Sequence, residues 1–117
     1  MAGDTSSIGQ HFEKSEPEVH ATYKAILNVA KKFGPVQEEA KKTSIHLVRR
    51  TAFAGVATRK NALILTLKSG SDVSSKRITK HEQVSANRWH LDVRLAEPSD
   101  VDQEVAAWLK RAYEMTG

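Results

Sequence analysis

The sequence predicts a two-layer α+β sandwich, in which an antiparallel sheet of four or five strands carries two helices on one face. Strict alternation of apolar and polar residues over residues 88–95 indicates a strand with one buried and one polar face. Apolar stripes of helical period lie near both ends of the chain, and everything between them is β-like. We expect a polar, disordered tail over residues 1–9 and a single α+β domain over residues 10–117.

The first helix is predicted to start near Ser15 and to stop at Gly34-Pro35. Ser15 is placed as its N-cap, Pro17 suits the first turn, and Glu18 sits where a capping-box acid reaches back. The apolar stripe consists of Val19, Tyr23, Ile26, Leu27, Ala30 and Phe33. This spacing predicts a helix with one face on the core.

The middle of the chain is predicted to form the strands. Residues 36–42 are ambiguous, because their composition permits a helical turn but no apolar stripe would anchor one. Short β-type runs follow around residues 45–48 and 53–56, and the most apolar run, residues 62–67, suits a central strand. The strand pattern over residues 77–84 is weaker, because Ile78 and Val84 are its only large aliphatic residues.

The second helix is predicted to follow Pro98, with Ser99 as its N-cap. Its apolar stripe consists of Val101, Val105, Trp108, Leu109 and Ala112. Two helices packed at roughly 8–10 Å cover about 20 Å, which is close to the width of four or five strands at about 4.8 Å. One face of the sheet is therefore expected to be covered, with Trp89 and Leu91 beneath the helices, and the other face bare.

Composition excludes several classes of protein. No run approaches the roughly 18 apolar residues of a membrane span, so we expect no membrane partner. The chain has no cysteine, which removes disulfides and thiolate chemistry and fits a cytoplasmic location. Residues 41–94 hold twelve Lys or Arg but only three acidic residues, a balance of +9 within a total of +4. This asymmetry could attract an anionic partner, although strand edges also use Lys and Arg merely to prevent aggregation.

The polar side of the sheet gives the candidate site. We predict that the bare face carries a set of basic ligand-binding candidates: His46, Arg50, Arg88, His90 and Arg94. A face that mixes Arg, His and aliphatic residues resembles an interface more than ordinary solvated surface. We therefore predict a non-enzymatic binding or interaction module, whose partner is a second copy of the chain, an anionic ligand or an acidic protein. A plain solvated face is the simpler interpretation.

Two other functions stay open. One is non-specific binding of nucleic-acid backbone, which needs little more than Lys and Arg. The other is a small enzyme that uses His46 or His90 with a nearby Arg, although in a simple meander these histidines would lie on opposite edge strands. No catalytic motif is present, and the five histidines lack metal-ligand spacing, so we predict no cofactor and no metal.

Three stretches, residues 49–56, 87–95 and 105–113, resemble a bacterial family of standalone domains known only as a domain of unknown function. The resemblance covers roughly residues 10–116, with Arg50, Phe53, His90 and Arg94 at motif positions. Relatives are sometimes labelled as transport proteins, a label that finds no support in a sequence without a membrane span or export signal. The resemblance implies no activity, cofactor or catalytic residue.

Overall fold

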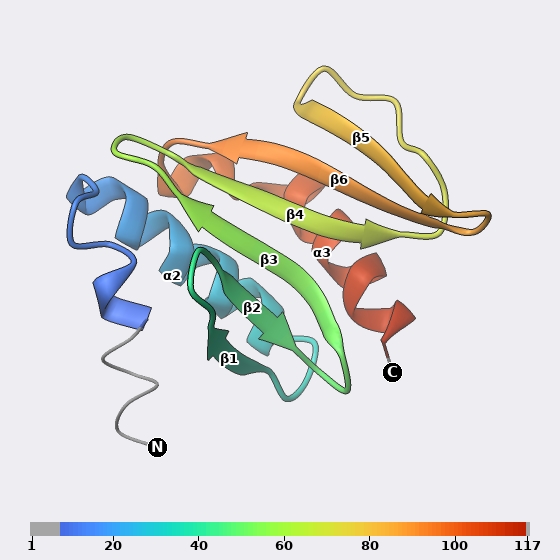
Figure 1. Cartoon of the computed structure of the whole chain (residues 1–117), viewed down its shortest axis with the longest axis horizontal. Coiled ribbons are helices and arrows are strands. Elements are labelled where there is room, and N and C mark those ends of the chain that lie inside the picture. The colour runs from blue at the N-terminus through green and yellow to red at the C-terminus, as the bar shows by residue number, and fades with distance from the viewer. Residues whose placement is uncertain (1–7, 117) are drawn as a thin grey trace.

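Within residues 8–116, six strands form one antiparallel sheet, and both long helices lie on the same side of it (Figure 1). The computed structural model describes residues 8–116. The elements are α2 (Pro17–Lys31), β1 (Gln37–Ala40), β2 (Ile45–Val48), β3 (Ala52–Thr58), β4 (Leu63–Ser69), β5 (Ile78–Ser85), β6 (Arg88–Leu95), the 3-10 helix η1 (Pro98–Asp100) and α3 (Gln103–Met115). The strand order is β1-β2-β3-β4-β6-β5. The predicted α+β sandwich is confirmed, with more strands than predicted. Most of the expected tail lies outside the described residues, and residues 8–10 are helical.

The additional strand is β1, in the segment that the sequence left ambiguous. β1 pairs with β2 in antiparallel register, with Glu38 opposite Leu47 on the helix side of the sheet. A carboxylate there needs a partner, and the buried Tyr23 hydroxyl of α2 donates a hydrogen bond to Glu38 Oε1. Burial, and this bond to Glu38, raise the pKa of Tyr23 far above its ordinary value. The weakly predicted strand over residues 77–84 is also present, as the edge strand β5.

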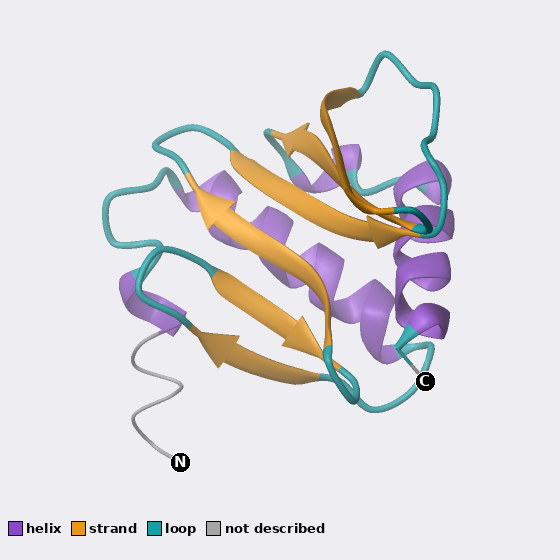
Figure 2. Cartoon of the chain, turned by 45° about the vertical axis from the view of Figure 1, so that its right-hand side comes forward, coloured by secondary structure: helices purple, strands orange, loops and turns teal. Residues whose placement is uncertain are grey.

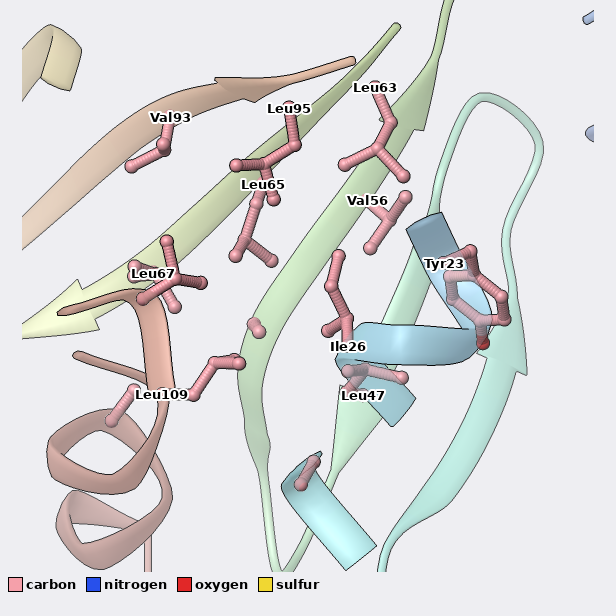
Figure 3. Packing of buried hydrophobic residues seen from close by; sticks show 14 of the residues in the cluster. Tyr23, Ile26, Leu47, Val56, Leu63, Leu65, Leu67, Val93, Leu95 and Leu109 are labelled. Carbon is pink, nitrogen blue, oxygen red and sulfur yellow. The ribbon is translucent and has the colours of Figure 1, made fainter. Parts of the chain in front are cut away.

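The core lies between the sheet and the helices (Figure 3). Cross-strand neighbours in β3, β4 and β6 supply its centre, because Val56 pairs with Leu65 and Leu65 with Val93. Helix residues Ile26 and Leu109 pack against this layer. Trp89 is only partly buried, so the expected alternation holds best for Leu91, Val93 and Leu95.

A β-bulge brings an aromatic ring into this core. Leu47 pairs with Ala54 but Val48 pairs with Ala52, so Phe53 is the extra residue of β3. By simple alternation Phe53 would share the bare face with Gly55. Instead Phe53 is fully buried, and its ring stands edge-on to Tyr113 of α3 at 5.3 Å.

The two helix N-termini differ from the prediction. Ser15 does not cap α2: Glu16 is at the N-cap without a side-chain bond, and the Ser15 hydroxyl donates to the Arg59 carbonyl. Ser99 does not cap α3, because the 3-10 turn η1 intervenes and the α-helix starts later. The cap is Asp102, whose carboxylate accepts from the Val105 amide at 3.1 Å.

The predicted stop after the first helix is confirmed and has a specific contact. Gly34 has a φ of +150°, and a Cβ there would lie 2.4 Å from the Tyr113 hydroxyl oxygen. That hydroxyl donates to the Pro35 carbonyl at 3.0 Å. Arg49 lies over the Tyr113 ring and donates to the Tyr113 carbonyl, so the end of α2, the β2–β3 turn and the end of α3 meet here.

Candidate functional site

The bare face of the sheet carries a groove of about 320 Å³. In Figure 2 this face is turned toward the viewer, with α2 and α3 behind the strands. Its lining comes from β2, β3, β4 and β6 and from the loop before β2: Ser44, His46, Ala52, Phe53, Ala54, Gly55, Val56, Ala57, Thr66, Lys68 and His90. Small-ligand sites occupy about 300–1,000 Å³, so this groove suits a small molecule.

The groove exists because β3 presents small side chains between larger neighbours. Ala52, Gly55 and Ala57 lie along its floor, while His46 on β2 and Thr66 on β4 flank Gly55 directly across the sheet. A Cβ placed on Gly55 would lie 3.8 Å from His46 Cδ2 and 4.0 Å from Thr66 Cβ. Gly55 does not have a positive φ, so the backbone does not require glycine there. Its effect is to leave space above the strand.

The pairing register gives the groove a direction. His46, Gly55, Thr66 and Asp92 form one row across four strands. Lys68 and His90 pair in the next row, at the Ala52 end of β3. Positions two apart in a strand are about 7 Å apart, so the groove has a basic end and, beyond Gly55, a small-residue end at Ala57.

The basic end of the groove brings together Lys68, His90 and the nearby Arg88, with few acidic side chains beside them. Burial lowers the pKa of Lys68, and the nearby Arg88 guanidinium lowers that pKa further. No ion pair within residues 8–116 involves Lys68. His90 has one acidic neighbour, Glu82 of β5, whose Oε1 lies 3.9 Å from His90 Nδ1. This end of the groove therefore favours a negatively charged group.

A second acidic residue near the groove, Asp92, is already engaged. Asp92 Oδ1 accepts a hydrogen bond of 2.7 Å from the Thr66 hydroxyl, across the pair of strands β4 and β6. This bond orients the Thr66 side chain beside Gly55. It also occupies part of the Asp92 carboxylate, which does not line the groove.

Two of the five predicted site residues line the groove, and the other three do not. His46 and His90 line the groove, and Arg88 is close enough to act on Lys68. Arg50 lies in the exposed β2–β3 turn and is not part of the lining. Arg94 is also outside the groove, where its guanidinium donates to Asn61 Oδ1 at 3.5 Å.

The histidines do not form a catalytic pair. Their strands are each one position in from the sheet edges, so the expected placement on opposite edges is wrong. Three inter-strand steps of about 4.8 Å and one row separate His46 from His90, which puts their Cα atoms roughly 15 Å apart. Two imidazoles at that separation can contact the two ends of one ligand but cannot share a proton.

A family model described as "Domain of unknown function (DUF5655)" matches residues 8–116. The chain belongs to this family. No curated protein and no solved structure matches the chain. The DUF5655 match spans every element of the sandwich and names no activity, so the function must be inferred from the groove itself.

The residues that shape the groove were not identified from the sequence. Lys68 continues the alternation of Ile64 and Thr66, and that period places it on the bare face. The small residues Ala52, Gly55 and Ala57 can be read from the sequence. Whether they form the floor of a groove depends on which strands flank β3, and the sequence does not give the strand order. Within the described residues no group of three or more His, Asp or Glu could hold a metal ion, and no helix is long and apolar enough to cross a membrane.

Proposed function

We propose that this domain is a binding module that holds a small anionic ligand in the groove on the bare face of its sheet. The observation that carries the proposal is Lys68, a partly buried cation that lines the groove beside His90 and has Arg88 as its charged neighbour. An anion bound there would relieve the repulsion between Lys68 and Arg88. It would also receive charge-assisted hydrogen bonds, which are about twice as strong as neutral ones.

The same geometry speaks against the other candidate partners. A second copy of the chain docked face to face about a two-fold axis through the basic end would bring two identical basic ends together, and like charges at an interface are costly. Nucleic-acid backbone would need a continuous basic surface. Arg77 is taken up by Asp102 and Glu104, and Arg49 is committed to Tyr113. The separation of His46 from His90 excludes only an enzyme that uses both, and one histidine with a nearby Arg stays a prediction.

Titration with inorganic phosphate at low ionic strength tests the proposal. We expect chemical-shift changes in the ¹⁵N–¹H spectrum concentrated at Lys68, His90 and their neighbours on β4 and β6. Ligand binding should also stabilise the fold by RT ln(1 + [L]/Kd), about 2.7 kcal/mol at a hundredfold excess over Kd. Both effects should be lost in Lys68→Met and kept in Lys24→Met, where the lysine is an exposed residue of α2.

Phosphate shifts that spread evenly over all basic residues would contradict the proposal, because they would indicate general screening and not a site. Equal responses of the Lys68→Met and Lys24→Met variants would contradict it in the same way.

We also infer a cytoplasmic location. The inference rests on composition, because a chain of 117 residues without any cysteine gains nothing from an oxidising compartment. Fractionation of cells that express the full chain tests it, and recovery from the periplasmic or membrane fraction would contradict it.

A further inference from the structure

We propose that the ligand is a planar apolar molecule that carries one anionic group, with its ring above Gly55 and its anion at Lys68 and His90. This inference rests on the proposed function, since it assumes that the groove is the anion site. It adds a ligand class and an orientation. Three features lead to it: the width of the groove at Gly55, the chemistry of the floor, and the distance from Gly55 to the basic end.

The groove is narrow where it crosses β3. His46 Cδ2 and Thr66 Cβ are 3.8 and 4.0 Å from the point above Gly55 where a Cβ would lie, so these two atoms are no more than about 8 Å apart. Carbon atoms in contact are about 3.5–4.0 Å apart. A single planar group therefore fills the gap between His46 and Thr66 and touches both walls. A puckered saturated ring or a branched aliphatic chain is too thick for it.

The floor supports a ring and offers little to a polar group. Ala52, Gly55 and Ala57 carry no polar side-chain atom, and residues 54–58 of β3 pair with β4, while Phe53 at the bulge has no partner in the strand register. The Thr66 hydroxyl is already donated to Asp92. The imidazole of His46 borders the floor, where it can pack against an aromatic ring.

The distance between the ring position and the basic end sets the length of the ligand. Lys68 lies one strand across and one row along from Gly55, which places the two Cα atoms roughly 8 Å apart. One or two fused aromatic rings with an attached carboxylate or phosphate span such a distance. The anion would then face Lys68 and His90, with Arg88 adding charge from the start of β6.

Binding of four probes to the full chain, followed by ¹⁵N–¹H spectra, tests the inference. The probes are 2-naphthoate, cyclohexanecarboxylate, 2-naphthalenemethanol and inorganic phosphate. We expect 2-naphthoate to shift Gly55, Thr66 and Lys68 together and to bind at least tenfold more tightly than either organic analogue. A tenfold ratio corresponds to about 1.4 kcal/mol. Phosphate should shift Lys68 and His90 but leave Gly55 nearly unchanged.

Two substitutions of one glycine separate this inference from the proposed function. Gly55→Val fills the gap between His46 and Thr66, so we expect naphthoate affinity to fall at least tenfold while the phosphate response at Lys68 persists. Gly55→Ala adds a Cβ at ordinary contact distance and should have a smaller effect. Circular dichroism of both variants verifies that the fold is intact, and if Gly55→Val fails to fold, Gly55→Ala with the four-probe series decides.

The outcomes are distinguishable. If phosphate binds at Lys68 but naphthoate binds no better than cyclohexanecarboxylate, the planar ligand is wrong and the proposed anion site stands. If 2-naphthalenemethanol matches naphthoate, the carboxylate contributes nothing and the planar anionic ligand is wrong, while the phosphate response at Lys68 still decides the proposed function. If no anion shifts Lys68 or His90, the proposed function is wrong and the inference falls with it.

Discussion

The two faces of the sheet use the same strands in opposite ways. On the covered face β4 presents Leu63, Leu65 and Leu67, which are all buried beneath the helices. On the bare face the same strand presents Ile64, Thr66 and Lys68, which are only partly buried. The neighbouring strand β3 adds Val56 to the covered face and Gly55 to the bare one. One face is filled by large side chains, and the other is hollowed by small ones.

The difference separates the residues that stabilise the fold from those that would contact the proposed ligand. Burial of a Leu side chain contributes about 1.5–3 kcal/mol, so the covered face supplies most of the folding free energy. The bare face contributes little to the core, and its residues are free to serve a ligand. Substitutions on the covered face should therefore change the free energy of unfolding, and substitutions on the bare face should change affinity.

The largest expected effect is on the covered face. Leu65→Ala removes a fully buried side chain that sits between Val56 and Val93, and we expect a loss of about 2–5 kcal/mol in the free energy of unfolding. Thr66→Ala, the next residue on the same strand, removes one hydrogen bond to Asp92 and should cost only about 1 kcal/mol. Urea denaturation of both variants measures the contrast, and similar losses would break the distinction between the faces.

The second prediction compares two glycines. Gly34→Ala forces a Cβ against the Tyr113 hydroxyl at a positive φ, so we expect a loss of roughly 1–3 kcal/mol. Gly55→Ala meets only ordinary contacts and restricts the unfolded chain, so its change should stay within about 1 kcal/mol and can be stabilising. Thermal unfolding of the two variants gives the comparison. A greater loss for Gly55 would mean that this glycine serves the fold and not the groove.

The covered face was largely predictable from the sequence. Period-2 alternation identified β6, a short apolar run identified β4, and helical stripes identified α2 and α3, because each pattern lies in neighbouring residues. The strand β1 was not predictable in this way. Its Glu38 faces the helix layer only because Tyr23 donates to it, and that partner lies 15 residues away. The cap of α3 was predicted too early in the chain. Pro98 and Ser99 begin the 3-10 turn η1, and the α-helix starts only after Asp102.

The groove was only half predictable. Alternation placed His46 and His90 on the bare face, and both line the groove. Their place on one groove depends on the strand order β2-β3-β4-β6 and on the small residues of β3, which no local pattern reveals. Alternation also placed Arg94 on the bare face, where it pairs with Ile64, but that position lies beyond the lining of the groove. Arg50 lies in the exposed β2–β3 turn and does not line the groove either.

The third prediction tests how the helix layer is held to the sheet. Asp102 caps α3 and pairs with Arg77, which precedes β5. Asp102→Ala should cost about 1 kcal/mol as a lost cap, and Asp102→Asn should cost less, because Asn also caps. Ser99→Ala, at the exposed residue expected from the sequence to be the cap, should stay within about 0.5 kcal/mol.

The pH dependence gives a second measurement of the same residue. The hydrogen bonds from Arg77 and from the Val105 amide hold the pKa of Asp102 below its ordinary value. A lowered carboxyl pKa stabilises the fold above the unfolded-state pKa of about 4 and loses that effect as the pH falls through the folded-state value. The difference between the wild type and Asp102→Ala should therefore shrink below about pH 4. A difference that stays constant down to pH 2 would exclude the charged interaction as its source.

The smallest effect on stability is expected at the residue with the largest expected effect on binding. Lys68→Met keeps an unbranched side chain one atom shorter and removes a charge that burial and Arg88 already disfavour, since both lower the pKa of Lys68. The free energy of unfolding should change by less than about 0.5 kcal/mol at pH 7. The wild type should gain stability relative to Lys68→Met as the pH rises toward 10, because a lysine with a lowered pKa binds fewer protons when folded than when unfolded. Affinity for inorganic phosphate, measured on the same samples, should nevertheless fall at least tenfold. If Lys68→Met were instead as destabilising as Leu65→Ala, Lys68 would contribute to the core, and the two faces would not have separate roles in stability and binding.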